Sequence, residues 1–421
     1  MSFHYLNREL HVEEIPIATI IAKFGSPCYI YSQALLQRQW CTFEQLLQNA
    51  QICYAVKANS NLAILARLAK WGAGFDIVSG GELARVMQVG GDVKKTVFSG
   101  VGKTSEEIKT ALQANIGCFN VESESELFRI EAIAKNLHKM ASIALRINPN
   151  IDAKTHPYIT TGLKETKFGM SANDALPLYR HAATSPHLKI QGISCHLGSQ
   201  LTTLDPFLQA IEQLLDLAEQ LKKENIELKT INLGGGLGVS YQQEKVPTPQ
   251  EYCQQILVAL KKRNATLQLI IEPGRVITAQ AGILVTKVEY LKANSDKNFA
   301  IADAGMNDLI RPALYHAEQN ILPIIQRCDL PEKNYDVVGP ICESSDFLGK
   351  NRQLAIQAGD YLAIMDSGAY GFSMSFNYNS RPRAAEVMVD KNQSFLIRSR
   401  ETLEQLWQNE KLLFTHQKIF E

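Results

Sequence analysis

The chain has 421 residues, with 43 Lys and Arg against 43 Asp and Glu, and eight cysteines. A formal net charge of zero without a polybasic run excludes the electrostatic pattern of a nucleic-acid-binding or membrane-surface protein, so small-molecule chemistry is the leading class. The length exceeds one ordinary domain, and it can accommodate an α/β barrel of about 250 residues together with a second domain.

Sequence pattern excludes further classes. No segment approaches the ~18 consecutive apolar residues of a membrane span, and the first residues lack the pattern of a signal peptide, so we expect a soluble, cytoplasmic protein. The cysteines form no Cys-x-x-Cys pair, which argues against a zinc site or a disulfide scaffold. No His, Asp or Glu cluster has metal-ligand spacing, and we therefore expect no metal.

The first 32 residues contain one predicted strand, at positions 24–32, which we expect to pack on the C-terminal domain. From 33 to 285, short apolar runs then alternate with helical patterns, as in βα units on a parallel sheet. Eight strands are predicted, at Ile52–Val56, Gly74–Val78, Thr96–Ser99, Cys118–Val121, Ser142–Ile147, Ile190–Cys195, Thr230–Leu233 and Gln268–Ile271. Eight such units in about 250 residues indicate a (β/α)8 TIM-type barrel rather than a doubly wound sheet.

Helix starts support this interpretation. Thr104 and Ser123 are each followed three residues later by glutamate, which is capping-box spacing, and Thr248 combines that spacing with proline at the first helical position. Asp205 followed by Pro206 is a further predicted N-cap. After residue 285 the pattern changes to short strands separated by turns, with helices only near 311–317 and 402–411. We therefore predict that residues 286–421, together with 1–32, form a mostly-β domain of the β-sandwich or Greek-key barrel type.

Polar and charged side chains follow the predicted barrel strands, at the end where barrel active sites lie. They are Lys57, Asp76, Glu122, Arg146, Asn148, His196, Gly234–Gly236, Glu272 and Arg275. Each has an ordinary alternative: Lys57 could be a solvated lysine, the glycines an unliganded tight turn, and His196 a structural histidine. Pyridoxal 5′-phosphate (PLP) requires an amine, a phosphate-binding turn, a carboxylate and a ring that stacks on the cofactor. The residues above include a candidate for each.

Seven ordered motifs resemble those of the barrel-type PLP-dependent basic amino-acid decarboxylases, over about residues 25–389. They are Tyr54-Ala-Val-Lys57-Ala-Asn, Phe75-Asp-Ile-Val-Ser-Gly-Gly-Glu-Leu83, His196-Leu-Gly-Ser-Gln200, Gly234-Gly-Gly236, Glu272-Pro-Gly-Arg275, Cys342-Glu-Ser-Ser-Asp346 and Gly368-Ala-Tyr-Gly371. The segment 152–169 also resembles an insertion after the fifth strand in the branch that acts on diaminopimelate. That branch is the most similar one.

The resemblance implies a role for each cofactor-site residue. Lys57 would hold PLP as a Schiff base, Glu272 would pair with the pyridine nitrogen, and His196 would stack on the ring. Asp76 would support the site near Lys57. The remaining cofactor-binding residues would be Ser199, Gly234, Gly235, Gly236, Pro273, Gly274, Arg275 and Tyr370.

The resemblance also implies the substrate and the partner. The reaction would be decarboxylation of meso-2,6-diaminoheptanedioate to L-lysine and CO2, the last step of lysine biosynthesis. The substrate-binding residues would be Arg275, Arg311, Tyr315, Glu343 and Tyr370, with Glu343 receiving the distal ammonium. Cys342, otherwise an ordinary buried thiol, would be the proton donor. Cys342 and Glu343 would reach the partner subunit's barrel in a homodimer with shared active sites.

Three alternatives remain at this point. A related PLP decarboxylase could act on ornithine, arginine or carboxynorspermidine, although Glu343, Arg311 and Tyr315 argue against it. An amino-acid racemase of similar fold would pair the pyridine nitrogen with arginine, where this chain has Glu272. A non-enzymatic regulator of the same fold would not need Lys57 or Cys342.

Overall fold

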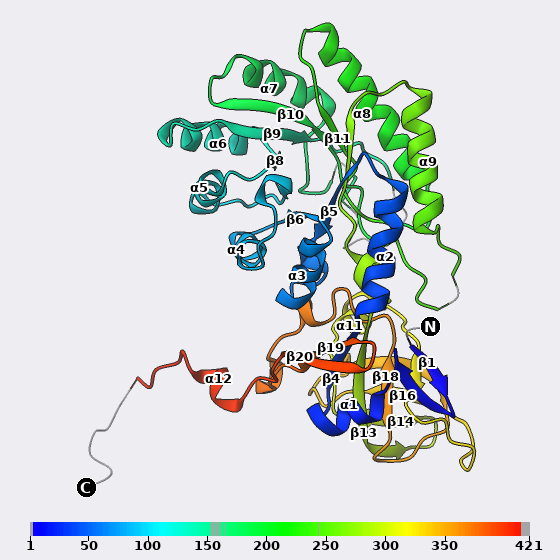
Figure 1. Cartoon of the computed structure of the whole chain (residues 1–421). Coiled ribbons are helices and arrows are strands. Elements are labelled where there is room, and N and C mark those ends of the chain that lie inside the picture. Colours follow the sequence, from blue (N-terminus) through cyan, green and yellow to red (C-terminus); the bar gives the residue numbers. More distant parts are fainter. Residues whose placement is uncertain are drawn as a thin grey trace. The chain divides into compact units, whose positions relative to one another are not determined.

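The computed structural model describes residues 3–152, 156, 159, 161–163, 165–242 and 244–413. The segment expected to form an insertion, 152–169, falls partly outside these residues. The chain forms two compact units, which Figure 1 colours along the sequence. The first comprises Ser32–Gly282 and Met365–Ser373, and the second comprises Met1–Tyr31, Ile283–Ile364 and Met374–Glu421. The segment Met365–Ser373 thus belongs with the barrel, although the sequence placed it within the range of the β domain.

The first unit is a closed eight-stranded parallel barrel, as predicted. Its strands are β5 (Gln51–Ala55), β6 (Gly74–Ile77), β7 (Thr96–Phe98), β8 (Cys118–Val121), β9 (Ala141–Arg146), β10 (Leu188–Ser194), β11 (Thr230–Asn232) and β12 (Gln268–Ile271). Neighbouring strands follow in chain order, and β12 pairs with β5 to close the ring. The strands are buried on both faces, which is why they read as apolar runs rather than as alternating patterns.

Helices surround these strands (Figure 1). They are α2 (Gln33–Leu46), α3 (Leu62–Lys70), α4 (Gly80–Gln88), α5 (Ser105–Ala114), α6 (Glu124–Asn136), α7 (Ala172–Thr184), α8 (Asp205–Lys223), α9 (Pro249–Lys262) and the short α10 (Arg275–Thr278). In the described part of this unit or next to it lie the 3-10 turns η1 (Val56–Ala58), η2 (Val93–Lys95) and η4 (Phe372–Met374).

The predicted helix starts are confirmed in part. Thr104 and Thr248 form complete capping boxes with Glu107 and Glu251. Ser123 caps α6, but the Glu126 side chain accepts from the backbone N–H of Glu122 instead of completing the box. The predicted N-cap at Asp205 is wrong by one residue: α8 begins at Asp205, so the N-cap is the preceding leucine.

The second unit is mostly β, as predicted. Its main sheet has nine strands in one branched network: β17-β16-β14-β13-β4-β19-β20, with β18 pairing with β13 and β15. Their bounds are β4 (Cys28–Ser32), β13 (Gly282–Ala293), β14 (Asn298–Ala302), β15 (Ile321–Pro323), β16 (Lys333–Val338), β17 (Phe347–Leu354), β18 (Tyr361–Ile364), β19 (Ala385–Asp390) and β20 (Gln393–Arg398). The strand predicted at 24–32 is β4, so N-terminal residues do complete this sheet.

Smaller elements complete the second unit. A three-stranded sheet contains β1 (Phe3–Leu6), β2 (Glu9–Val12) and β3 (Ile15–Pro16), and is followed by helix α1 (Ile17–Phe24). The sequence did not predict these four elements. Helices α11 (Arg311–Tyr315) and α12 (Leu403–Trp407) are shorter than expected, and η5 (Tyr378–Ser380) precedes β19. Among the described residues, none of the helices has both the length and the apolar character needed to span a membrane.

Candidate active site

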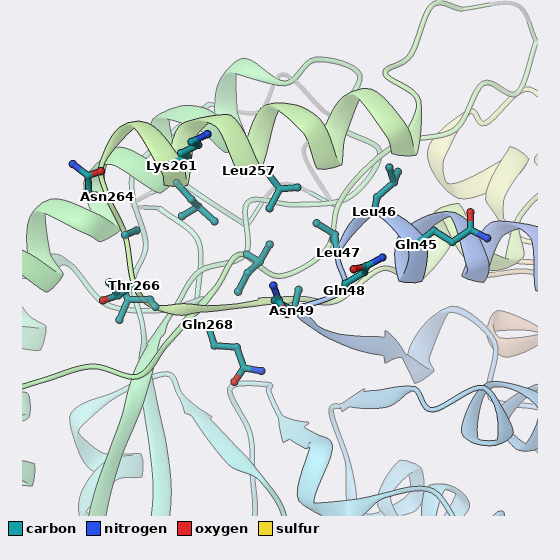
Figure 2. A pocket seen from close by; sticks show the side chains of 15 residues that line it. Gln45, Leu46, Leu47, Gln48, Asn49, Leu257, Lys261, Asn264, Thr266 and Gln268 are labelled. Atoms are coloured by element: carbon teal, nitrogen blue, oxygen red, sulfur yellow. The ribbon is translucent and has the colours of Figure 1, made fainter.

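A cavity of about 170 Å³ lies in the barrel unit, where several strands end. It is lined by Lys57, Asp76, Val78, Ser99, Gly100, Asn120, Arg146, Thr161, Phe168, Ser194, Cys195, His196 and Glu272. A larger depression, of about 810 Å³, is lined by the C-terminal part of α2, the C-terminal part of α9 and the start of β12 (Figure 2). Its fifteen lining residues include one charged side chain, Lys261. The titratable groups therefore gather in the smaller cavity.

Lys57 lies on η1 directly after β5, and its amine contacts the Asp76 carboxylate on the neighbouring strand β6. Asp76 is fully buried, whereas the Lys57 side chain is 32% exposed. Burial alone would lower the pKa of the Lys57 amine, but the nearby Asp76, Tyr370 and Glu272 outweigh burial and raise that pKa. The apolar strand that precedes Lys57 would by itself favour a neutral amine. In the protein without a cofactor, the charge of Asp76 reverses that effect.

Glu272 directly follows β12 and is 5% exposed. Its Oε1 accepts hydrogen bonds from the side-chain amides of Asn232, at 2.7 Å, and Asn120, at 3.2 Å. Burial, together with the charge of Asp76, raises the pKa of Glu272 to about 8. In the described part of the chain Oε2 has no hydrogen-bond partner, although Glu272 lines the cavity. The carboxylate is therefore oriented by neutral groups and lacks a directly paired cation.

His196 follows β10 and lies beside the glycine turn after β11. Its Nδ1 accepts a hydrogen bond from the backbone N–H of Gly235, at 3.1 Å, which is the arrangement of a neutral ring with the proton on Nε2. Burial, together with the positive charges of Arg146 and Lys57, lowers the pKa of His196 well below its ordinary value. The ring is thus held uncharged at the cavity wall.

The glycine turn has no room for side chains. A Cβ at Gly235 would lie 2.2 Å from the carbonyl oxygen of Glu272, and Gly234 has a φ of +67°. The N–H groups of Gly234 and Gly235 donate to Asn232 Oδ1 and His196 Nδ1. For the N–H of Gly236 the described residues provide no acceptor, so it is the one of the three that remains available to an anion.

Arg275 is buried and lies close to the side chains of Ser199, Tyr241 and Tyr370. Its guanidinium donates to Ser199 Oγ at 2.8 Å and to Tyr241 Oη at 2.7 Å. The guanidinium carbon lies 4.8 Å from the centre of the Tyr370 ring. The Tyr370 N–H donates to the carbonyl of Ala58, which places this tyrosine next to Lys57. The barrel unit thus holds a compact set of donors around one arginine.

Pro273 and Gly274 help to hold the strand ends together. The carbonyl of Pro273 accepts from the N–H of Ala55, at 3.1 Å. A Cβ at Gly274 would lie 2.9 Å from the Cβ of Ala55. These two residues thus position the Glu272 and Arg275 side chains rather than offering side-chain groups of their own.

A buried ion pair joins two more strand-end residues, Arg146 and Glu122, at 2.6 Å. Glu122 also accepts from the N–H groups of Gly100 and Gly169. Arg146 lines the cavity and lies over the Phe168 ring, 4.9 Å from its centre. The pair fixes the wall of the cavity.

Four residues at this site were not predicted from the sequence. Asn120 and Asn232 orient Glu272, and Tyr241 contacts Arg275. Glu82 lies near Lys57, and burial raises its pKa to about 7. The two asparagines had a usable signal, since each is a polar residue in an otherwise apolar barrel strand. Glu82 lies within the motif that ends at Leu83, but no role was assigned to it. Tyr241 had no signal, because its position depends on how a loop returns to the barrel.

The other four predicted site residues belong to the second unit. Arg311, buried, and Tyr315, half-buried, lie on α11. Cys342 and Glu343 are exposed and lie in the loop between β16 and β17. The cavity lined by Lys57 therefore contains none of these four.

The barrel residues match what PLP requires. One cavity is lined by the accessible amine of Lys57 and by the buried carboxylate of Glu272, which has no directly paired cation among the described residues. Such a carboxylate can pair with a protonated ring nitrogen. Arg275, Ser199 and the free N–H of Gly236 provide anion-binding donors. Within the described residues no group of three or more His, Cys, Asp or Glu is arranged to hold a metal ion.

Residues 33–279 match the family model described as pyridoxal-dependent decarboxylase, pyridoxal binding domain. The chain is 55% identical over 407 residues to a diaminopimelate decarboxylase of Haemophilus influenzae, covering 96% of this chain and 98% of that protein.

Two solved structures are similar over nearly the whole chain. A diaminopimelate decarboxylase of Helicobacter pylori, complexed with L-lysine, is 43% identical with a TM-score of 0.90, covering 94% of this chain and 99% of that one. A diaminopimelate decarboxylase of M. jannaschii is 38% identical with a TM-score of 0.93, covering 98% of both chains. The chain belongs to the diaminopimelate decarboxylase family of pyridoxal-dependent decarboxylases.

Proposed function

We propose that this chain is a carboxy-lyase that converts meso-2,6-diaminoheptanedioate to L-lysine and CO2 with PLP as cofactor, the last step of lysine biosynthesis. The observation that carries the proposal is that Lys57 and Glu272 line the same cavity, in a barrel whose family is diaminopimelate decarboxylase. An amine and a buried carboxylate are the two groups that a PLP decarboxylase needs on opposite parts of its cofactor.

PLP, when bound, supplies an electron-accepting ring that stabilises the electrons left on carbon when CO2 departs. Lys57 would hold it covalently, and Glu272 would pair with its ring nitrogen. Since Lys57 must lose a proton to act as a nucleophile, the contacting Asp76 carboxylate is the adjacent acceptor. The neutral His196 would present its ring face, and Arg275 with Ser199 would bind the phosphate.

Substrate selection follows from the charges of the molecule. The distal end of diaminoheptanedioate carries a carboxylate and an ammonium, and leaving either unpaired in a site is costly. Arg275, Arg311, Tyr315 and Tyr370 would bind the carboxylate, with arginine able to hold it through two parallel hydrogen bonds. Glu343 would receive the ammonium. This pairing would discriminate against substrates that lack either group.

Cys342 would donate the proton that replaces CO2. Its Sγ–H bond breaks, a C–H bond forms at the carbon that lost CO2, and the thiolate regains a proton from solvent, to which Cys342 is exposed. Cys342 and Glu343 belong to the unit that does not contain Lys57. In our proposal they are supplied by the partner subunit, in a homodimer whose active sites are shared.

A cytoplasmic location is also part of the proposal. All eight cysteines are free thiols, which fits a reducing compartment. Five of them are buried, so most of the thiols are structural and Cys342 differs from them in its exposure.

The alternative is a related decarboxylase that acts on ornithine, arginine or carboxynorspermidine. A structure of a lysine/ornithine decarboxylase of Vibrio vulnificus is only 24% identical to this chain, with a TM-score of 0.79, and is evidence of a common fold alone. The far higher identity to diaminopimelate decarboxylases favours the main proposal.

The test is CO2 release by the PLP-loaded protein from each of these amino acids. We expect release from meso-2,6-diaminoheptanedioate, and at least about a thousandfold less from the Lys57→Ala variant, which should also lose the visible absorbance of bound cofactor. Lys70→Ala, an exposed lysine at the end of α3, is the matched control and should be unchanged. Release from ornithine in preference to diaminoheptanedioate would overturn the proposal.

A further inference from the structure

The loop that contains η5 lies against the two residues proposed to complete the active site. The side-chain oxygen Oδ1 of Asn379 accepts a hydrogen bond from the backbone N–H of Cys342, at 3.0 Å. The neighbouring Glu343 carboxylate raises the pKa of the Tyr378 hydroxyl, so Glu343 lies near the same loop.

The backbone at this contact has an unusual conformation. Asn379 has a φ of +54° and Ser380 a φ of +53°, so two successive residues that are not glycine lie in the left-handed region. Asparagine tolerates this region because its short polar side chain can hydrogen-bond to nearby backbone. A serine side chain offsets less of the steric cost of a positive φ. Such a conformation persists where surrounding contacts determine it, and it aims the Asn379 side chain at Cys342.

The loop that carries Cys342 and the loop that carries Asn379 are both hydrogen-bonded to the backbone of residues 306 and 307. The buried carboxylate of Asp346 accepts from the N–H groups of Met306, at 2.6 Å, and Ile341, at 2.7 Å. From the other loop, the N–H of Phe376 donates to the carbonyl of Asn307, at 3.0 Å. The positions of Cys342 and Asn379 are therefore fixed relative to one another through residues 306 and 307.

The Glu343 carboxylate is oriented without being neutralised. Ser345 Oγ donates to Glu343 Oε2 at 3.0 Å. In the described part of the chain no cation pairs with Glu343. A neutral hydroxyl restricts the side chain while leaving its negative charge available, which is what binding of an ammonium requires.

We propose that Asn379 is a positioning residue for the reaction: it holds the backbone that carries the Cys342 thiol. This inference rests on the proposed function, in which Cys342 donates a proton. Loss of this contact should therefore affect proton delivery rather than substrate binding.

For Asn379 the test compares two substitutions that suit its backbone conformation. Asn379→Gly removes the acceptor and should lower kcat about tenfold, with KM within about twofold and a larger solvent deuterium isotope effect. Asn379→Asp keeps an acceptor in a residue that tolerates the left-handed region, and should restore most of kcat. Equal losses in both variants would contradict the role.

Asn377→Ala is the matched control for loosening the loop. Asn377 donates to the carbonyl of Arg381 in the same loop and to the carboxylate of Glu401 beyond β20, and neither contact involves Cys342. If this variant reproduces the effect of Asn379→Gly, Asn379 acts only by stabilising the loop and the proposal is overturned.

A readout independent of catalysis separates this inference from the proposed function. Alkylation of Cys342 by iodoacetamide, measured by peptide mass spectrometry against the exposed Cys328, should be several-fold faster in Asn379→Gly than in Asn379→Asp. Equal rates would overturn the proposed positioning of Cys342. Wild-type protein that binds PLP but releases no CO2 from diaminoheptanedioate would instead overturn the proposed function, whatever the alkylation rates.

Discussion

Glu272 is a buried carboxylate whose direct hydrogen-bond partners, Asn120 and Asn232, are uncharged amides. Neutral donors orient a carboxylate but offset only part of the free-energy cost of removing its charge from water. In the cofactor-free protein this uncompensated desolvation raises the pKa of Glu272. A cation beside Glu272, such as a protonated cofactor ring, would stabilise its charged form. Cofactor binding and ionisation of Glu272 should therefore be coupled.

This coupling predicts a specific pH dependence of stability. The folded-state pKa of Glu272 is raised from 4.5 to about 8, so between these values the folded cofactor-free protein binds more protons than the unfolded chain. Its free energy of unfolding should therefore fall as pH rises through this window. The fall should be smaller in Glu272→Gln, which keeps an acceptor for both asparagines, and smaller in wild-type protein loaded with PLP.

Denaturant unfolding at a series of pH values measures this prediction. Glu82, Asp308 and Asp366 also have pKa values raised by burial, and remain in the variant, so the difference between wild type and Glu272→Gln isolates the one group. Parallel curves for the two cofactor-free proteins would mean that Glu272 does not titrate as argued.

At the scale of the elements, the glycine turn after β11 brings His196 and Glu272 together because it has no side chains. Gly235→Ala would place a Cβ 2.2 Å from the carbonyl oxygen of Glu272. Either the turn or the end of β12 must move, at a cost of about 1–3 kcal/mol in stability. We expect PLP affinity to fall at least about tenfold, because the groups proposed to bind it lie on those two segments.

The matched control is Gly102→Ala, in another loop that follows a barrel strand. An added Cβ at Gly102 meets no atom within 4 Å, so this variant should keep PLP affinity and change stability by no more than about 0.5 kcal/mol. PLP titration and thermal unfolding of both variants check the prediction. Equal PLP affinities for the two proteins would contradict it.

At the scale of the whole molecule, the proposed site residues are divided between two units. If the partner subunit supplies Cys342 and Glu343, chains with Lys57→Ala and chains with Cys342→Ala should complement each other. Random mixing produces hybrid dimers in which one of two sites has both residues, so activity should return to about a quarter of wild type.

Wild-type chains mixed with the double variant Lys57→Ala, Cys342→Ala are the control. With shared sites, hybrids of these two chains have no intact site, whereas sites made within one chain would keep one per hybrid. CO2 release after subunit exchange measures both mixtures. Failure of the single variants to complement, together with active hybrids in the control, would place Lys57 and Cys342 of one site in the same chain.

The sequence by itself determined the eight-stranded barrel, the mostly-β second unit, the capping boxes of α5 and α9, and the position of Lys57, Glu272 and Arg275 after barrel strands. These features depend on local patterning and on the rule that strand ends of a barrel meet at one rim. The short elements β1, β2, β3 and α1 were missed, since runs of two to eight residues carry little periodicity.

Only the tertiary structure decided the electrostatics. The Lys57 amine is paired with Asp76 and its pKa is raised, whereas an apolar strand before it had suggested a neutral amine. Asn120 and Asn232 orient Glu272, and Asn379 contacts the backbone of Cys342 from 37 residues further along the chain. The reason is physical: periodicity is a property of neighbours in sequence, but a charge responds to every group that folding brings within a few ångströms of it.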